Sequence, residues 1–247
     1  MLTALADDLL ADRIGRPASE VLALHGWMRS GADFAPVVAG EDALAVHFPG
    51  FGITPEPPAV WGSTEYADQL AGALAGTGPY TVVGHSFGGR VAVRLAVRHP
   101  ELVRSLVLTG APLVRATPPP TPALRLRLAK RLVGWHLVPE SVVERIRRNA
   151  GSDDYRALQG RMREIFVRVV NEDYREDLAR ISVPTTFVWG ELDDQAPLAG
   201  ARLAASLVPG AGLEVVPSGG HLLTGPVARA VAAALAAHLD TDRGSTA

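Results

Sequence analysis

The chain has 247 residues and a mass of 26.0 kDa, a length that suits one large domain or one domain with an insertion. Its net charge of −2 is too small for a nucleic-acid-binding protein, and the absence of cysteine excludes disulfides, thiol catalysis and thiolate metal sites. No apolar run reaches the roughly 18 residues of a membrane span, and no basic segment of a secretory signal opens the chain. We therefore expect a cytoplasmic protein that binds neither membranes nor nucleic acid.

Six short apolar runs, rich in Val and Leu, are typical of strands buried on both faces of a sheet. In chain order these runs are 20–24, 43–48, 80–84, 103–109, 184–189 and 213–216. Helix-period runs lie between them or follow them, at 64–75, 87–98, 198–207 and 227–239. Strands that alternate with helices predict a mostly parallel sheet with right-handed crossovers. The segment before residue 20 leaves room for at most two further short strands.

The alternation stops between residues 112 and 180. This segment opens with the proline-rich sequence TPPPTP and continues with helix-like runs at 123–136, 141–148, 154–171 and 174–180. It holds 14 Lys and Arg against 9 Asp and Glu, whereas the rest of the chain holds 10 against 17. We predict a helical insertion over 112–180, between a first core part at 1–111 and a second core part at 181–247.

The most specific motif is GHSFGG at residues 84–89, which fits the pattern G-x-S-x-G between a predicted strand and a predicted helix. Ser86 would occupy the sharp turn between the two elements, and Gly84 and Gly88 would let them approach each other. The N-terminus of the helix adds partial positive charge, which favours a developing anion beside the serine. The alternative is a chance Gly-Ser-Gly turn.

A nucleophilic serine needs a base, and the base needs an orienting acid, in the chain order serine, acid, histidine for this type of turn. Of the seven histidines, His25, His47 and His85 precede the serine. Of those that come after it, only His221 follows a predicted short strand, in the glycine-containing loop PSGGH. The loop after the 184–189 run offers three acids, namely Glu191, Asp193 and Asp194. The order and position of these residues predict a catalytic triad.

An oxyanion formed at the serine would need two backbone N–H donors. Phe87 follows the nucleophile and would supply one of them. Trp27, in the loop HGWM at 25–28, would supply the other, although its side chain is equally suited to core packing. A substrate pocket would lie between the insertion and the sheet. Its candidate residues, each as readily explained by core packing, are Met28, Trp61, Trp135 and Phe166.

Together these motifs resemble those of the α/β-hydrolase superfamily, over residues 21 to 239. The matching segments are LHGW and FPGFG in the first part of the chain, the elbow GHSFGG, the acid loop VWGELDDQAP and the histidine loop GGH. The resemblance places the acid on Asp193, with Asp194 as the alternative. It implies an α/β fold with a doubly wound, mostly parallel sheet of about seven or eight strands and a helical cap after the sixth strand. The sequence departs from the family pattern at His47, where an aspartate is common. We expect this difference to change the local hydrogen bonding.

The resemblance implies a serine hydrolase that cleaves a carboxylic ester or thioester of a small substrate, as a monomer or homodimer. Ser86 would attack, His221 would act as the base, and Asp193 would orient His221. No cofactor or metal is expected, because the sequence has no H-E-x-x-H, P-loop or G-x-G-x-x-G motif. A serine nucleophile argues against haloalkane dehalogenases and epoxide hydrolases, whose nucleophile is an aspartate.

Two alternatives keep the same fold. One is a non-hydrolytic reaction of the triad: acyl transfer, perhydrolysis or a lyase reaction. The lyase reaction is included because GGRVA after the serine is similar to the sequence in menaquinone-pathway lyases. An anionic substrate of such an enzyme would meet the basic insertion, although a solvated helix face is the simpler interpretation of its arginines. These arginines are Arg125, Arg127, Arg131, Arg145, Arg147 and Arg148. The other alternative is a ligand-binding receptor.

Overall fold

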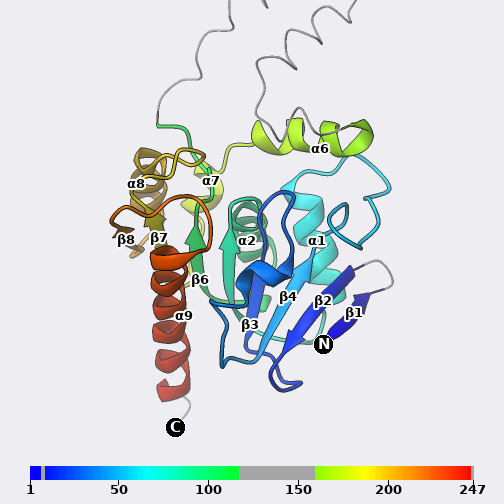
Figure 1. Ribbon diagram of the computed structural model, residues 1–247, viewed down its shortest axis with the longest axis horizontal. Helices are drawn as coiled ribbons and strands as arrows, with labels where there is room; N and C mark the ends of the chain where they lie inside the picture. Colours follow the sequence, from blue (N-terminus) through cyan, green and yellow to red (C-terminus); the bar gives the residue numbers. More distant parts are fainter. Residues whose placement is uncertain (7–8, 117–158, 246–247) are drawn as a thin grey trace, which may run out of the picture.

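A computed structural model describes residues 1–6, 9–116 and 159–245 of the chain. Its eight strands form one sheet in the order β1-β2-β4-β3-β5-β6-β7-β8 (Figure 1). Neighbouring strands from β4 through β8 run parallel, and β2 runs antiparallel to both β1 and β4. The strands are β1 (Leu2–Ala6), β2 (Leu9–Ile14), β3 (Val21–Leu24), β4 (Ala43–His47), β5 (Tyr80–His85), β6 (Val103–Thr109), β7 (Thr185–Gly190) and β8 (Gly212–Val216). The predicted mostly parallel sheet is confirmed, and two short strands occupy the N-terminal segment.

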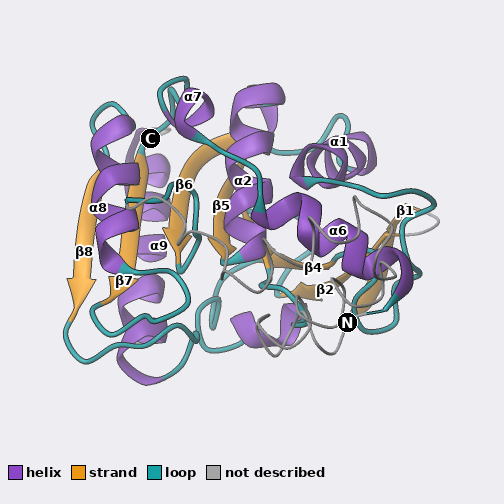
Figure 2. Ribbon diagram, turned by 90° about the horizontal axis from the view of Figure 1, so that it is seen from above, coloured by secondary structure: helices purple, strands orange, loops and turns teal. Residues whose placement is uncertain are grey.

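Helices lie on both faces of this sheet, as predicted for a doubly wound fold. The α-helices are α1 (Ser63–Ala73), α2 (Phe87–Arg98), α6 (Gly160–Val170), α7 (Arg175–Leu178), α8 (Leu198–Leu207) and α9 (Gly225–Ser245), and the 3₁₀ turns are η1 (Gly31–Phe34) and η2 (Pro100–Leu102). The four helices predicted within the core parts correspond to α1, α2, α8 and α9, of which α9 is longer than predicted at both ends. Figures 1 and 2 show α6 lying across the end of the sheet toward which the parallel strands point.

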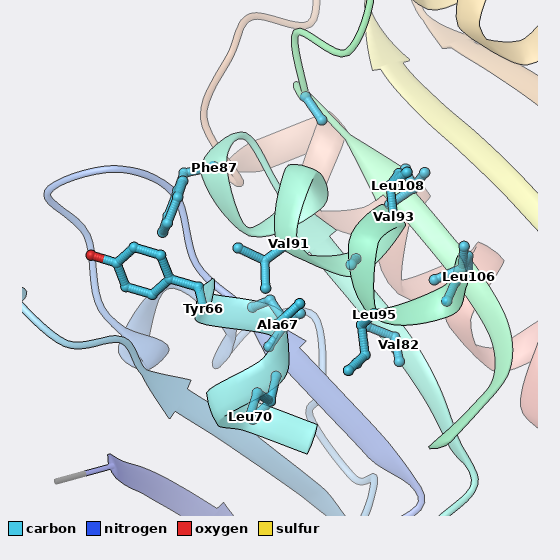
Figure 3. Packing of buried hydrophobic residues seen from close by; sticks show 14 of the residues in the cluster. Tyr66, Ala67, Leu70, Val82, Phe87, Val91, Val93, Leu95, Leu106 and Leu108 are labelled. Carbon is cyan, nitrogen blue, oxygen red and sulfur yellow. The ribbon is translucent and has the colours of Figure 1, made fainter. Parts of the chain in front are cut away.

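Alternate residues of the central strands face two different cores. In β3, Leu22 and Leu24 belong to the core beneath α1 and α2, whereas Val21 and Ala23 belong to the core beneath α9. Figure 3 shows the first core, with Tyr66, Ala67 and Leu70 of α1, Phe87, Val91, Val93 and Leu95 of α2, and Val82, Leu106 and Leu108 of the strands. Because both faces are buried, these strands are continuous apolar runs rather than alternating ones.

Residues 110–184 connect β6 to β7 and contain the predicted insertion. Its described residues form α6 and α7 and no strand, in agreement with the predicted run at 174–180 and the second half of the run at 154–171. The runs predicted at 123–136 and 141–148 lie outside the described residues. Helix α6 buries Met162, Ile165 and Val169 against the rest of the molecule. It therefore forms part of the wall above the strand ends.

Candidate active site

The backbone of Ser86 forms the sharp turn between β5 and α2, with φ of 52° and ψ of −112°. A positive φ is uncommon for a residue with a side chain, so this turn holds a strained conformation. Glycine is required on both sides of the turn. A Cβ atom at Gly88 would lie 2.0 Å from the carbonyl oxygen of Leu24, and one at Gly84 would lie 2.7 Å from the Cα of Gly89. The close approach of β3, β5 and α2 thus fixes the position of Ser86.

Asp193 and His221 follow β7 and β8 and meet beside this turn. The Nδ1 atom of His221 lies 3.0 Å from Oδ1 and 2.9 Å from Oδ2 of Asp193, whose side chain is almost completely buried. The backbone N–H groups of Gln195 and Ala196 also donate to Oδ1 of Asp193, at 3.0 and 2.8 Å. A carboxylate only accepts hydrogen bonds, so Nδ1 of His221 carries a proton and donates it to Asp193.

The other two acids of this loop have different surroundings. Asp194 is exposed to solvent and lies on the wall of the cavity described below. Glu191 is also exposed and accepts the backbone N–H of Ser218 at 3.2 Å. Asp193 is therefore the acid of this loop that is hydrogen-bonded to His221.

Ser86 and His221 line one cavity of about 340 Å³. Its apolar wall is formed by the side chains of Trp27, Phe87, Pro112, Phe166, Val169 and Val170. No hydrogen bond joins Ser86 to His221 within the described part of the chain. Such bonds are often long before a substrate binds and shorten in the complex. The cavity can hold a carbonyl carbon beside a hydroxyl nucleophile and an imidazole base.

Two backbone donors stand at this cavity without acceptors. Neither the N–H of Trp27 nor that of Phe87 donates a hydrogen bond to any residue in the described ranges. The Trp27 ring packs edge-on against Phe51, Phe87 and Phe166, with ring centroids 4.9 to 5.3 Å apart. This packing holds the loop of Trp27 against the first turn of α2.

The side chain of His25 makes hydrogen bonds at the start of the loop that contains Trp27. It is completely buried, with Nδ1 2.7 Å from the carbonyl oxygen of Gly26 and Nε2 accepting the N–H of Phe48 at 3.1 Å. A ring nitrogen that accepts cannot carry a proton, so Nδ1 is the donor to Gly26. Burial lowers the pKa of His25 to about 4, and the ring is neutral near neutral pH.

The predicted pocket residues differ in their surroundings. Trp27 and Phe166 line the cavity, whereas Met28 and Trp61 line neither it nor the adjoining cavity beside Arg90. Met28 is 53% exposed, and Trp61 packs edge-on against Tyr66, with ring centroids 5.2 Å apart. Trp135 and the six arginines of the insertion lie outside the described residues.

His47 has a partner of its own. Its Nε2 atom lies 2.9 Å from Oδ2 of Asp12 on β2, and its carbonyl oxygen accepts the hydroxyl of Thr54 at 3.0 Å. The histidine thus ties β4 to the antiparallel strand beside it and to the loop that follows.

Two residues near Ser86 were missed in the sequence. His85 is buried, and its Nε2–H donates to the carbonyl oxygen of His221 at 2.9 Å. Burial lowers the pKa of His85 to about 4. The helical spacing of the sequence places Arg90 on the polar face of α2, but in the structure it is only 5% exposed and lines the cavity. The available signal was its spacing, because residues four apart share one face of a helix.

The described residues contain no group of three or more His, Asp or Glu side chains arranged to hold a metal ion. None of the described helices is both long enough and apolar enough to cross a bilayer.

Known proteins similar to this chain cover most of its length. Pimeloyl-[acyl-carrier protein] methyl ester esterase from Chromobacterium violaceum is 28% identical, with 95% of this chain and 99% of the relative covered. A 2-hydroxy-6-oxononadienedioate/2-hydroxy-6-oxononatrienedioate hydrolase from Cupriavidus pinatubonensis is 29% identical, with 84% and 82% covered.

Solved structures show the same fold. An esterase from Exiguobacterium antarcticum superimposes with a TM-score of 0.69 at 20% identity, covering 94% of this chain and 95% of the other. A bromoperoxidase from Bacillus anthracis gives a TM-score of 0.70 at 21% identity, with 97% and 99% covered. The family model described as the alpha/beta hydrolase family matches residues 21–234. The chain therefore belongs to the α/β-hydrolase family.

Proposed function

We propose that this chain is a serine esterase in which Ser86, His221 and Asp193 form the catalytic triad. Ester hydrolysis as the reaction class follows from the family and from curated relatives named as esterases and hydrolases. The residue assignment is the further step. The observation that carries it is the hydrogen-bonded pair of Asp193 and His221 in one cavity with a serine on a strained strand-to-helix turn.

The reaction would use only groups of the chain and water. Ser86 Oγ attacks the ester carbonyl carbon while Nε2 of His221 takes the hydroxyl proton. The carbonyl oxygen becomes an oxyanion, held by the N–H groups of Trp27 and Phe87. The protonated His221 then gives its proton to the departing alkoxide, which leaves as an alcohol. Asp193 stabilises the imidazolium throughout.

Water completes the cycle. It attacks the acyl group on Ser86 as His221 removes one of its protons, and His221 returns that proton to Ser86 Oγ. The acid leaves and the free enzyme is restored. The apolar cavity wall suits a small or medium-sized acyl group, and the methyl ester cleaved by the Chromobacterium relative is an ester of the same broad class.

A fluorophosphonate probe tests the nucleophile. We expect wild type to be labelled covalently and Ser86→Ala not to be labelled, whereas Ser206→Ala, at an exposed serine of α8, should label like wild type. A panel of p-nitrophenyl esters of increasing acyl length then measures turnover. A wild type that is not labelled would contradict the triad. Labelling without turnover of any ester would favour a lyase, an acyltransferase or a receptor.

A further inference from the structure

Arg90 is a buried cation in the wall of the proposed active site. It lies on α2, four residues after Ser86, and therefore on the same face of the helix. Only 5% of its surface is exposed. It lines the cavity that contains Ser86 and His221, and it also lines an adjoining cavity that shares this part of the wall.

The partners of Arg90 leave its charge without a counter-charge. One of its terminal nitrogens donates to the carbonyl oxygen of Val169, at the end of α6, and its guanidinium carbon lies 5.6 Å from the centre of the Tyr174 ring. It makes no ion pair with any described residue. Arg94 and Arg98, the next arginines on this helix, pair with Asp177 and Asp68. Arg90 alone of the three lines the cavity.

The carboxylates near Arg90 are engaged elsewhere or face solvent. Glu172 accepts hydrogen bonds from Ser63 and Tyr174, and Asp173 pairs with Arg175. Asp194 lines the same cavity but is exposed and forms no ion pair with Arg90. A buried charge is costly unless it is paired, and a guanidinium has five N–H donors, of which the bond to Val169 uses one.

We propose that Arg90 binds a carboxylate on the acyl chain of the substrate, so that the preferred substrates are monoesters of short dicarboxylic acids. The inference rests on the proposed esterase function of Ser86. A guanidinium matches a carboxylate in geometry as well as in charge and can donate two parallel hydrogen bonds to it. The ester carbon would lie at Ser86, the second carboxylate at Arg90, and the intervening methylene groups against Phe166 and Val169.

Matched pairs of methyl esters test this proposal in the wild type. Each pair consists of the monomethyl ester of a dicarboxylic acid, from succinic to suberic acid, and the amide of that same monoester. The amide has the same shape but no charge. We expect kcat/KM at neutral pH to favour the acid by about tenfold or more at the best chain length, because a charge-assisted bidentate contact is stronger than a neutral one. An equal or lower kcat/KM for the acid overturns the proposal.

The variant Arg90→Gln should lose this preference, so that its kcat/KM values for the acid and the amide become equal. Arg90→Lys, which keeps the charge but not the paired donors, should retain part of it. Arg115→Gln is the matched control, because the exposed Arg115 donates to the carbonyl oxygen of Val170 just as Arg90 donates to that of Val169. This control should keep the full preference. An equal fall for acid and amide in Arg90→Gln, or loss of the preference in Arg115→Gln, assigns Arg90 a purely structural role.

Inhibition of the wild type provides a readout that does not depend on how the variant folds. Adipate should compete with p-nitrophenyl acetate at lower concentration than hexanamide does, and equal inhibition contradicts the proposal. A wild type that reacts with fluorophosphonate and hydrolyses both esters of a pair equally overturns this inference alone. A wild type that neither labels nor hydrolyses either ester overturns the proposed function, and the inference falls with it.

Discussion

At the scale of single residues, the neighbours Asp193 and Asp194 have very different surroundings. Asp193 is buried and accepts two backbone N–H groups as well as Nδ1 of His221, whereas Asp194 is exposed. The two backbone donors hold the carboxylate in place beside the His221 ring. An acid held in this way can set the histidine tautomer, and an exposed one beside it cannot.

We expect Asp193→Asn to lower kcat by about 10²- to 10⁴-fold, because the amide can hold the imidazole in the wrong tautomer and cannot stabilise its charge. Asp194→Asn is the matched control and should change kcat by no more than a few-fold. Steady-state hydrolysis of a p-nitrophenyl ester measures both. A larger loss in Asp194→Asn than in Asp193→Asn would move the acid to the neighbouring residue.

His85 gives a second prediction at this scale, as a positioning residue. Its Nε2–H holds the carbonyl oxygen of His221, and its ring centroid lies 4.9 Å from that of His221. We expect His85→Leu to lower kcat by about tenfold with KM changed less than twofold, because small displacements of a catalytic group are costly. His85→Gln, which can donate to the same carbonyl, should recover much of the rate. Equal rates for the Leu and Gln variants would show that this hydrogen bond does not position His221.

At the scale of elements, α2 packs closely against β3 beside the nucleophile. A Cβ atom at Gly88 would lie 2.0 Å from the oxygen and 2.3 Å from the carbon of the Leu24 carbonyl. Both atoms belong to the backbone of a central strand and cannot move independently of the sheet. The helix must therefore shift if Gly88 gains a side chain.

Gly88→Ala should accordingly lower the free energy of unfolding by about 1–3 kcal/mol or more and slow fluorophosphonate labelling of Ser86. Gly72→Ala provides the opposite case, because Gly72 lies within α1 and a Cβ atom there would meet nothing within 4 Å. It should raise the free energy of unfolding by about 0.4–1 kcal/mol. Urea unfolding and labelling rates measure both effects. An unchanged labelling rate in Gly88→Ala would show that the elbow tolerates a shifted helix.

At the scale of the whole molecule, the sequence predicted most of what local pattern determines. The central strands were recognisable because burial on both faces makes each a continuous apolar run, and the elbow, acid loop and histidine loop carry motifs at strand ends. Arg90 and Met28 show where pattern fails. Arg90 has the spacing of a solvated helix face, but α6 covers that face, and a contact between segments distant in sequence leaves no local signal. Met28 is apolar, yet it is 53% exposed.

The two buried histidines make the stability of the whole fold depend on pH. His25 and His85 have pKa values of about 4 in the folded chain, against 6.5 when unfolded, because burial disfavours the charged ring. Below pH 6.5 the unfolded chain therefore binds protons that the folded chain does not. The contribution of these two neutral rings to stability is fully present above pH 6.5 and is lost as the pH falls toward 4.

Between pH 7.5 and 5 the free energy of unfolding should fall by about 2 kcal/mol for each of the two histidines, as measured by urea denaturation. His85→Gln should reduce the loss by about half, because glutamine does not titrate. Three carboxylates have pKa values that are lowered by their hydrogen bonds and arginine partners, and their contributions to stability are lost mainly below this pH range. They are Asp42, Glu65 and Asp68. A free energy of unfolding that stays constant from pH 7.5 to 5 would show that the buried rings take up protons within the fold. The loops of Trp27 and His221, which these rings hold, would then tolerate two buried charges.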